Sequence, residues 1–293
     1  MKHLTCLRHV FLISFIFFFL LFATDLSFRG ICMAGFLACS SPTGQNNSNS
    51  DPSTPSYSIK INILYDNTVF KSGTTADWGF SCLVEGMEDT VLFDTGTQGA
   101  ILQHNLNELQ VDVSTVDQIV LSHNHGDHTG AILTVLGQHS DVVVNLPQSF
   151  DQMFIDRVIN TGASVHLHQA PDSICSDICL SGEMGQDIRE QSLILDTDSG
   201  LVVITGCSHP GIVSILERAR QIRKRPIYLV VGGFHLMNHS TTAVQEIIDE
   251  FQNLNVKYVA PTHCTGEEAI SLFRNAYENF FIQAGTGRVI YIP

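Results

Sequence analysis

The sequence predicts an α/β fold in which two mixed β-sheets pack face to face and helices cover both outer faces, a four-layer αββα sandwich. Short β-type runs alternate with amphipathic stretches from Ile59 to the end of the chain. Both halves of this region are rich in β-type runs, and hairpin and strand–helix–strand patterns both occur, which requires mixed pairing. The apolar fraction of 44% and the charged fraction of 15% leave ample material for a core.

The first half of the folded region predicts one group of strands. A turn at 86–89 joins the second and third strands, and a helix is expected over 130–136, between the last two. The β-type runs are SIKINILYD (58–66), FSCLVEG (80–86), DTVLFDTG (89–96), VDQIVLSH (116–123) and DVVVNLP (141–147).

The second half repeats this pattern. The run PIYLVVGG is wholly apolar, which is typical of a strand buried on both faces. Apolar residues at helical spacing predict helices over 211–222 and 244–254, and Thr265-x-x-Glu268 predicts a capping box that opens a last helix. The β-type runs are QSLILDT (191–197) and GLVVITG (200–206), expected to form a hairpin, then PIYLVVGG (226–233), KYVAP (257–261) and RVIYIP (288–293).

The N-terminal segment predicts export. Lys2 and Arg8 precede an apolar run over 10–23, which is typical of a secretory signal and short for a membrane-spanning helix of about 20 residues. The later sequence FLAC, ending at Cys39, is similar to the lipobox of bacterial lipoproteins. We therefore expect a signal and lipoprotein anchor over 1–39, and a periplasmic or cell-surface protein held by a lipid on Cys39. An ordinary cleaved signal or an uncleaved N-terminal anchor is the alternative.

Residues 40–58 predict a disordered tether, because a segment rich in Ser, Asn and Pro cannot bury apolar surface. The folded domain is then expected over 59–293. Within it, Cys175 and Cys179 could form a disulfide in an oxidising compartment, although their spacing fits two free thiols as well.

The charge distribution argues against a nucleic-acid partner. The net charge is −14, and there is no Lys or Arg from Ser72 to Asp156. A protein that neutralises phosphates along a nucleic acid needs the opposite distribution. We expect a small-molecule substrate, membrane contact through the anchor only, and no particular oligomeric state.

One loop, LSHNHGDHTG, concentrates titratable side chains. His123 and His125 lie two apart, as residues on one face of an extended chain do, and Asp127 and His128 follow once Gly126 lets the chain turn. Imidazole nitrogens suit zinc, iron or manganese, and a carboxylate adds an anionic ligand. Because these polar groups cannot share one structural loop cheaply without a cation, the loop predicts a metal site.

Other histidines also follow predicted strands. His209 comes after GLVVITG, His235 after PIYLVVGG and His263 after KYVAP. Ligands of open α/β sheets bind at the carboxyl ends of the strands, so these imidazoles are expected at one rim. A lone histidine after a strand is more often a satisfied polar group, and the remaining histidines of the domain are assigned to that class: His104, His139, His166, His168 and His239.

The pattern His123-x-His125-x-Asp127-His128 resembles the defining motif of the metallo-β-lactamase-fold hydrolases. VLFDTG and WGFS are similar to two accessory stretches of that family. More narrowly, EQSLILDTDSGLVVITGCSHPGI, VVGGFHL and APTHCTG are similar to the subgroup of 7,8-dihydropterin-6-methyl-4-(ribofuranosyl)aminobenzene-5'-phosphate synthases. The resemblance covers 59–293 and implies the metallo-β-lactamase fold.

The resemblance also implies two divalent metal ions, with zinc expected first and manganese or iron as alternatives. Asp94 would support the histidine loop through a hydrogen bond behind the ligands. Most superfamily members carry a bridging aspartate after the strand that here reads VVITG, where this chain has Cys207-Ser208-His209. The expected ligands are His123, His125 and His209 for the first ion, and Asp127, His128 and His263 for the second.

Further roles stay open at this point. Asp127 would also orient the nucleophile, and His235 would replace the missing bridge or act as an acid near the leaving group. Cys207 is either a ligand or a small buried residue. Backbone amides near Ser208 and Gly211 are expected at a helix N-terminus that favours an anion, with Phe234 as a further candidate contact to substrate.

The function that follows is a metal-dependent hydrolase. Water on such metal ions ionises near neutral pH and attacks a phosphoryl or acyl centre. The substrate is expected to be a small phosphorylated or ester-type metabolite. A lactonase or a β-lactamase-type acyl hydrolase is one alternative, and a non-catalytic lipoprotein that binds metal or ligand is another. The six-residue shell favours an enzyme, because a structural zinc site has four ligands and no open position.

Overall fold

The computed structural model of the chain describes residues 59–293. The predicted anchor over 1–39, the tether over 40–58 and Cys39 lie outside the described residues. In the described part, no helix has the length and apolar character that crossing a membrane requires.

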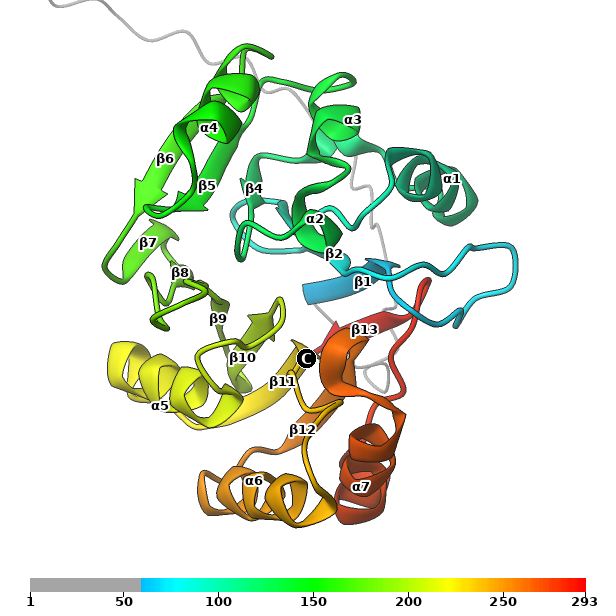
Figure 1. The fold of residues 1–293 in the computed structure, drawn as a ribbon, viewed down its shortest axis with the longest axis vertical. Helices are drawn as coiled ribbons and strands as arrows, with labels where there is room; N and C mark the ends of the chain where they lie inside the picture. The colour runs from blue at the N-terminus through cyan, green and yellow to red at the C-terminus, as the bar shows by residue number, and fades with distance from the viewer. Residues whose placement is uncertain (1–58) are drawn as a thin grey trace, which may run out of the picture. The chain divides into compact units, whose positions relative to one another are not determined.

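Two mixed β-sheets form the centre of the fold (Figure 1). The seven-stranded sheet has the order β13 (Val289–Ile292), β1 (Ile59–Tyr65), β2 (Ser81–Glu85), β3 (Val91–Phe93), β4 (Gln118–Val120), β5 (Val143–Pro147) and β6 (Ser164–His168). Its strands run antiparallel from β13 to β3 and parallel from β3 to β6.

The six-stranded sheet has the order β12 (Tyr258–Thr262), β11 (Ile227–Gly233), β10 (Gly200–Thr205), β9 (Leu193–Thr197), β8 (Ile178–Leu180) and β7 (Asp172–Cys175). β10, β11 and β12 are parallel, and β9 and β10 form the predicted antiparallel hairpin. Both sheets are therefore mixed, as the sequence predicts.

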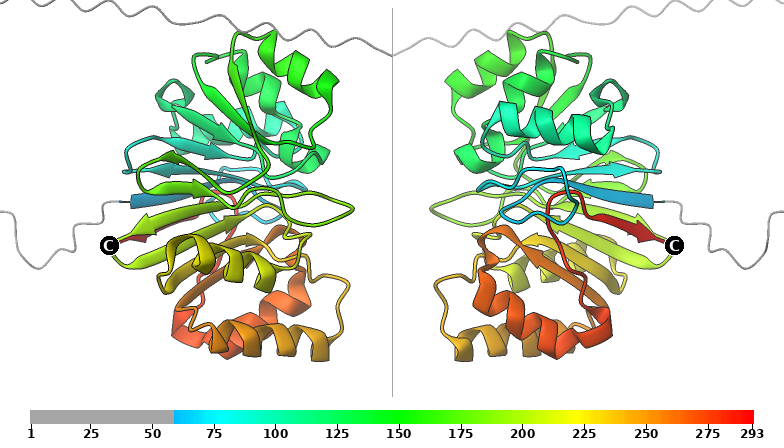
Figure 2. Two further views of the ribbon diagram at one scale, coloured as in Figure 1. Left: turned by 90° about the vertical axis from the view of Figure 1, so that its left-hand side faces the viewer. Right: turned by 90° about the vertical axis from the view of Figure 1, so that its right-hand side faces the viewer.

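Helices cover the outer face of each sheet (Figure 2). The first sheet carries α1 (Gly99–Leu109), α3 (Ile132–Leu136) and α4 (Gln152–Ile159), and the second carries α5 (Ile212–Arg223), α6 (Thr241–Asn253) and α7 (Glu267–Tyr277). Shorter turns are α2 (Gly126–Thr129), η1 (Val113–Thr115), η2 (His263–Thr265) and η3 (Glu278–Phe280).

Three apolar layers hold these elements together. Leu102, Ile132 and Phe154 bring α1, α3 and α4 into the layer over the first sheet. Side chains of both sheets, such as Phe93 and Val231, form the layer between them. The third layer joins the second sheet to its helices and contains Leu216, Ile248 and Phe273. Helix, sheet, sheet and helix thus alternate with three apolar layers, and the predicted four-layer sandwich is confirmed.

The helix predicted over 130–136 is confirmed as α3 (Ile132–Leu136). The preceding α2, which winds the histidine loop and includes a hydrogen bond from the Gly130 amide to the Gly126 carbonyl at 2.9 Å, was not predicted. One local prediction is wrong. The expected capping box at Thr265 does not form, since Gly266 is the N-cap of α7 and has no side-chain cap bond. The Thr265 hydroxyl contacts the Thr262 carbonyl and the Phe234 amide instead.

Cys175 and Cys179 are free thiols in the structure, so the possible disulfide does not form. Cys175 packs against the apolar layer between the sheets, whereas Cys179 lies in the layer under the helices. The two side chains leave the β7–β8 hairpin on opposite faces, which keeps their sulfurs apart.

Candidate metal centre

The predicted site residues follow the carboxyl ends of strands from both sheets. Asp94 follows β3 and His123 comes three residues after β4, while His209, His235 and His263 follow β10, β11 and β12. The local sequence therefore places each group at the end of a strand. Because the two sheets pack face to face, those strand ends lie along one rim.

Gly206, at the end of β10, lets the two rims approach closely. A Cβ atom at this position would lie 2.2 Å from Ser122 Oγ and 3.1 Å from Asp94 Oδ2. No side chain fits there without moving the groups behind the histidine loop.

The first cluster brings together His123, His125 and His209, whose ligand atoms lie within 4.8 Å of one another. His123 Nε2 is 3.0 Å from His125 Nδ1. The His209 ring centroid lies 4.8 Å from that of His123 and 5.1 Å from that of His125. Three imidazoles with an open fourth position are a known ligand set of catalytic zinc.

The second cluster brings together Asp127, His128, Cys207 and His263, again with ligand atoms within 4.8 Å of one another. Asp127 Oδ2 is 3.6 Å from His128 Nε2 and 3.4 Å from His263 Nε2. His128 Nε2 also lies 3.2 Å from the Cys207 sulfur. The three residues expected for the second ion are thus together, and Cys207 joins them.

Hydrogen bonds behind the two clusters orient one imidazole in each, His123 in the first and His128 in the second. The Ser122 hydroxyl donates to Asp94 Oδ2 at 2.7 Å, so its oxygen accepts from His123 Nδ1 at 2.9 Å. His128 Nδ1 donates to Asp94 Oδ2 at 2.7 Å. With these protons on Nδ1, both Nε2 atoms turn a lone pair toward the centre.

His263 is oriented in the same way, through Asn67. Its Nδ1 donates to Asn67 Oδ1 at 3.0 Å, which leaves Nε2 with a lone pair. The buried Nε2 atoms of His263 and His209 have no hydrogen-bond partner in the protein. Buried polar atoms without partners are rare, and here they face a set of nitrogen and carboxylate donors that fits a divalent ion.

The protonation states also suit metal binding. Burial, then the nearby imidazoles of His128 and His209, hold the pKa of His123 well below its ordinary value. Burial and the adjacent His235 lower the pKa of His209 to about 4. For Asp127, burial raises the pKa, but the nearby imidazoles of His263, 3.4 Å away, and His128 outweigh it, so the pKa lies below the usual range. These groups are deprotonated at neutral pH, as metal ligands must be.

Strained backbone marks the same strand ends. Of the eight non-glycine residues with positive φ in the described chain, four belong to the site: Asp94 (53°), Ser208 (68°), His235 (58°) and His263 (49°). Such conformations cost about 1–3 kcal/mol each and cluster at functional sites. At His235 and His263 the strained backbone places the side chain in a ligand cluster, whereas the Ser208 hydroxyl donates to the Gly233 carbonyl at 2.6 Å.

Glu190 occupies the amides that were expected to bind an anion. It is 1% exposed, and its carboxylate accepts from the amides of Cys207 at 2.9 Å, Ser208 at 2.8 Å and His209 at 2.8 Å. The Gly211 amide donates to the Ser208 carbonyl at 2.9 Å. The amides of Ser208 and Gly211 are therefore not free for an anion, because the protein already uses them. Gly211 is the N-cap of α5, as expected of a helix N-terminus, and an anion at the amides that follow it stays a prediction.

His235 lies at the edge of the centre. Its ring centroid is 4.3 Å from that of His209, and its ligand nitrogen lies within 4.8 Å of those of His209 and Cys207. It is exposed, so it can meet a substrate. Phe234 is 1% exposed, and its ring packs against Phe251 and Phe273 at 5.5 and 5.4 Å. Phe234 thus belongs to the core beneath the site and does not present its ring to a substrate.

Sequence reasoning missed four groups that act on the ligands: Ser122, Asn67, Trp78 and Glu190. The Trp78 indole Nε1 donates to Asp127 Oδ2 at 2.8 Å. Asn67 could have been found, because it follows β1 as the histidines follow their strands. Glu190 carries no signal of this kind, since it precedes a strand and is distant in sequence from the amides it binds.

A cavity of about 500 Å³ opens beside His263. Trp78 and Met237, with exposed fractions of 45% and 51%, are apolar groups in its lining. Arg274 and Glu267 supply charges to its wall. The cavity thus combines apolar surface with a cation next to the second cluster, which is typical of a small-molecule site.

The comparisons with known proteins agree with this geometry. The sequence model of the family described as "Metallo-beta-lactamase superfamily" matches residues 79–263. The 7,8-dihydropterin-6-methyl-4-(beta-D-ribofuranosyl)-aminobenzene-5'-phosphate synthase of Methanocaldococcus jannaschii is 25% identical over 79% of this chain and 96% of its own length. An uncharacterized protein of the same organism is 30% identical over 79% of this chain and 100% of its own length.

Among solved structures, Tm1679, described as a metal-dependent hydrolase of the beta-lactamase superfamily, superposes with a TM-score of 0.68 and 28% identity over 80% of this chain and 99% of that chain. The metallo-beta-lactamase fold protein YhfI from Bacillus subtilis gives a TM-score of 0.58 at 16% identity, over 80% of this chain and 99% of that chain. The second similarity concerns the fold alone.

Proposed function

Since the chain belongs to the metallo-β-lactamase superfamily and is a metal-dependent hydrolase, we propose that it holds two divalent ions, zinc before manganese or iron, and cleaves a small phosphorylated metabolite. His123, His125 and His209 would hold the first ion. Asp127, His128 and His263 would hold the second, and Cys207 is near enough to join them.

The observation that carries this proposal is the pair of buried Nε2 atoms on His209 and His263 that lack a partner. One belongs to each cluster, so each cluster contains a nitrogen whose lone pair is unpaired. An unpaired buried polar atom costs about 1–3 kcal/mol, and a bound cation removes that cost in both clusters.

The bound ions would supply Lewis acidity that activates water and neutralises charge on the attacked group. The chain's own residues prepare the site for this chemistry. Asp94 and Ser122 accept hydrogen bonds from Nδ1 of His128 and His123, respectively. The Trp78 indole donates to Asp127 Oδ2 and so fixes its position. His235 is exposed at the rim, where it can donate a proton to a leaving group.

Two features support a phosphorylated substrate. The relative from Methanocaldococcus jannaschii is named as the synthase of a compound that carries a 5'-phosphate. In this chain, the cavity beside His263 is lined by Arg274, whose guanidinium can bind a phosphate oxygen. A substrate whose apolar part contacts Trp78 and Met237 would reach from this cavity to the second cluster.

Metal analysis of the purified full chain, coupled to a hydrolysis screen, tests the proposal. The screen compares a phosphomonoester, a phosphodiester, an aliphatic lactone and a chromogenic β-lactam. We expect close to two metal ions per chain and phosphoester hydrolysis that His123→Ala abolishes and His104→Ala, a surface control, leaves intact. Hydrolysis of lactones or β-lactams alone would replace the phosphoester assignment with an acyl hydrolase. Metal binding without any turnover would indicate a binding lipoprotein.

We further propose that the protein is exported and held at a membrane through a lipid on Cys39. The basic and apolar start of the chain and the FLAC sequence support this. A tether over 40–58 would then separate the anchor from the hydrolase domain.

A further inference from the structure

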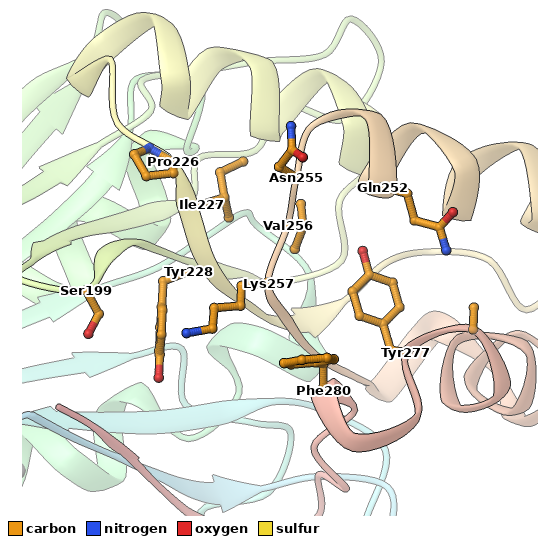
Figure 3. A pocket seen from close by; sticks show the side chains of 11 residues that line it. Ser199, Pro226, Ile227, Tyr228, Gln252, Asn255, Val256, Lys257, Tyr277 and Phe280 are labelled. Atoms are coloured by element: carbon orange, nitrogen blue, oxygen red, sulfur yellow. The ribbon is translucent and has the colours of Figure 1, made fainter. Parts of the chain in front are cut away.

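A second cavity, of about 550 Å³, lies at the opposite ends of β11 and β12 from the metal centre (Figure 3). Its lining includes Ile227, the first residue of β11, and Lys257, which directly precedes β12. The site histidines follow the other ends of these strands. Since β11 has seven residues, the two sites are separated by about 20 Å of strand. The cavity is therefore distinct from the hydrolytic site.

The cavity contains a hydrogen-bond donor without an acceptor. Tyr277 is only 6% exposed, and its buried hydroxyl has no partner in the structure. In Figure 3 this hydroxyl is directed between Val256 and Gln252, which also line the cavity. Burial raises the pKa of Tyr277 above its ordinary value, so the hydroxyl keeps its proton and remains a donor. A ligand with an acceptor atom would remove the cost of about 1–3 kcal/mol that an unpaired donor carries.

Aromatic rings and one cation form the rest of the wall. The Phe280 side chain is 48% exposed, and its ring lies 5.4 Å from that of Tyr258. Lys257 Nζ lies 5.0 Å from the Tyr228 ring centroid and 5.3 Å from that of Tyr258. Among the lining residues of the described chain, Lys257 carries the only charge.

We propose that this cavity binds a small aromatic anion that also carries a hydrogen-bond acceptor. The rings of Phe280 and Tyr277 would contact the planar part of the ligand, Lys257 would meet its negative charge, and the Tyr277 hydroxyl would donate to its acceptor. The cavity volume lies within the range of small-molecule sites, about 300–1,000 Å³. A neutral apolar ligand would leave the hydroxyl without an acceptor and would gain nothing from the charge of the ammonium.

Three matched probes separate these contributions. They are 4-hydroxybenzoate, 4-methylbenzoate, which keeps the shape and charge but lacks the acceptor, and 4-hydroxybenzamide, which lacks the charge. Calorimetric titration of the metal-loaded full chain gives each dissociation constant. We expect 4-hydroxybenzoate to bind about three- to tenfold more tightly than 4-methylbenzoate, the equivalent of one hydrogen bond. It should bind about two- to fivefold more tightly than the amide, the value of a solvent-exposed ion pair.

Two variants assign these differences to residues. Tyr277→Phe should erase the preference for 4-hydroxybenzoate over 4-methylbenzoate, without lowering the thermal unfolding temperature, because the lost hydroxyl had no partner in the protein. Lys257→Met should erase the preference for the anion over the amide. Tyr291→Phe and Lys71→Met, which alter residues outside the cavity lining, are the matched controls.

Carboxylates can also bind metal ions, so the titration is repeated with the His123→Ala/His128→Ala double variant. Binding that persists there, with the same preferences, supports the distal cavity whether or not the chain is a phosphoesterase. Loss of binding in the double variant would assign the probe to the metal centre and overturn the proposal. The proposal is also overturned if no probe binds at millimolar concentration, or if both cavity variants leave the preferences unchanged. A chain that binds no probe but forms a dimer, which Phe280→Asp dissociates, would overturn it as well.

Discussion

The Asp94 carboxylate and the His128 imidazole form a completely buried pair, with Oδ2 2.7 Å from Nδ1. The same Oδ2 accepts the Ser122 hydroxyl, which in turn orients His123. One carboxylate oxygen thereby sets the tautomers of one histidine in each cluster. Burial disfavours the charged form of His128, but the Asp94 charge outweighs it and raises the pKa of that imidazole.

Replacing Asp94 should therefore weaken both metal sites together. Asp94→Asn removes the charge and replaces one carboxylate oxygen by an NH2 group, which cannot accept a hydrogen bond. The side chain can then no longer accept from the Ser122 hydroxyl and His128 Nδ1 at one oxygen and from the Ser122 amide at the other. We expect about a 10- to 100-fold loss of affinity for each ion, the usual effect of losing a group that orients ligands. Competition with a chelating indicator measures both constants. Asp141→Asn, on the surface, is the control, and unchanged affinity in Asp94→Asn would refute this role.

Cys207 should act as a thiolate ligand of the second ion. Its sulfur lies 3.2 Å from His128 Nε2 and within 4.8 Å of the ligand atoms of Asp127 and His263. We expect cobalt(II) substitution to produce a thiolate-to-metal charge-transfer absorption band that is absent in Cys207→Ala. Cys82→Ala, which alters a thiol in the core between the sheets, should keep the band. A wild-type spectrum without such a band would mean that Cys207 is only a small buried residue.

Asp66 should make the stability of the metal-free protein depend on pH. Its side chain is completely buried, Oδ1 has no partner, and Oδ2 accepts the Thr262 hydroxyl. Burial outweighs that hydrogen bond and raises the pKa from 3.8 to about 6. The folded state thus holds the proton more tightly than the unfolded state. This stabilisation is fully present below pH 3.8 and is lost as the pH rises through 6.

Asp66→Asn has no charge to bury, so its free energy of unfolding should exceed that of the wild type above pH 6 by up to about 3 kcal/mol. The difference between the two proteins should grow between pH 4 and 6 and stay constant above that range. Urea denaturation across this range measures it, with Asp141→Asn as the reference. A difference that does not vary with pH would show that Asp66 is ionised in the folded protein throughout.

Cys39→Ser should release the protein from the membrane if the FLAC sequence carries a lipid anchor. The wild type should take up labelled palmitate and sediment with membranes, and the variant should do neither. Cys32→Ser, in the same segment, is the matched control and should behave as the wild type. Release of both proteins into the soluble fraction would favour an ordinary cleaved signal.

Much of the fold could be predicted from the chain because the apolar pattern is local. The alternation in SIKINILYD and the continuous run PIYLVVGG correspond to β1 and β11. Each of these strands is almost completely buried and pairs with two neighbouring strands. The short α2 was missed for the opposite reason. Its four residues are polar or glycine and carry no periodic apolar face, so only the fit of the loop against β3 and β4 winds it into a turn.

Within the site, the sequence by itself determined which groups stand at strand ends, because a histidine two or three residues past a β-type run needs no tertiary contact to be recognised. Only the tertiary structure decided which of them share an ion and what lies behind them. Glu190 takes the amides at 207–209, Asn67 orients His263 across 196 residues, and Cys207 reaches the second cluster. These contacts form because two sheets face each other across an apolar layer, one built from β1 to β6 with the C-terminal β13 and the other from β7 to β12. Such a packing brings together residues whose spacing in the sequence carries no trace of their proximity.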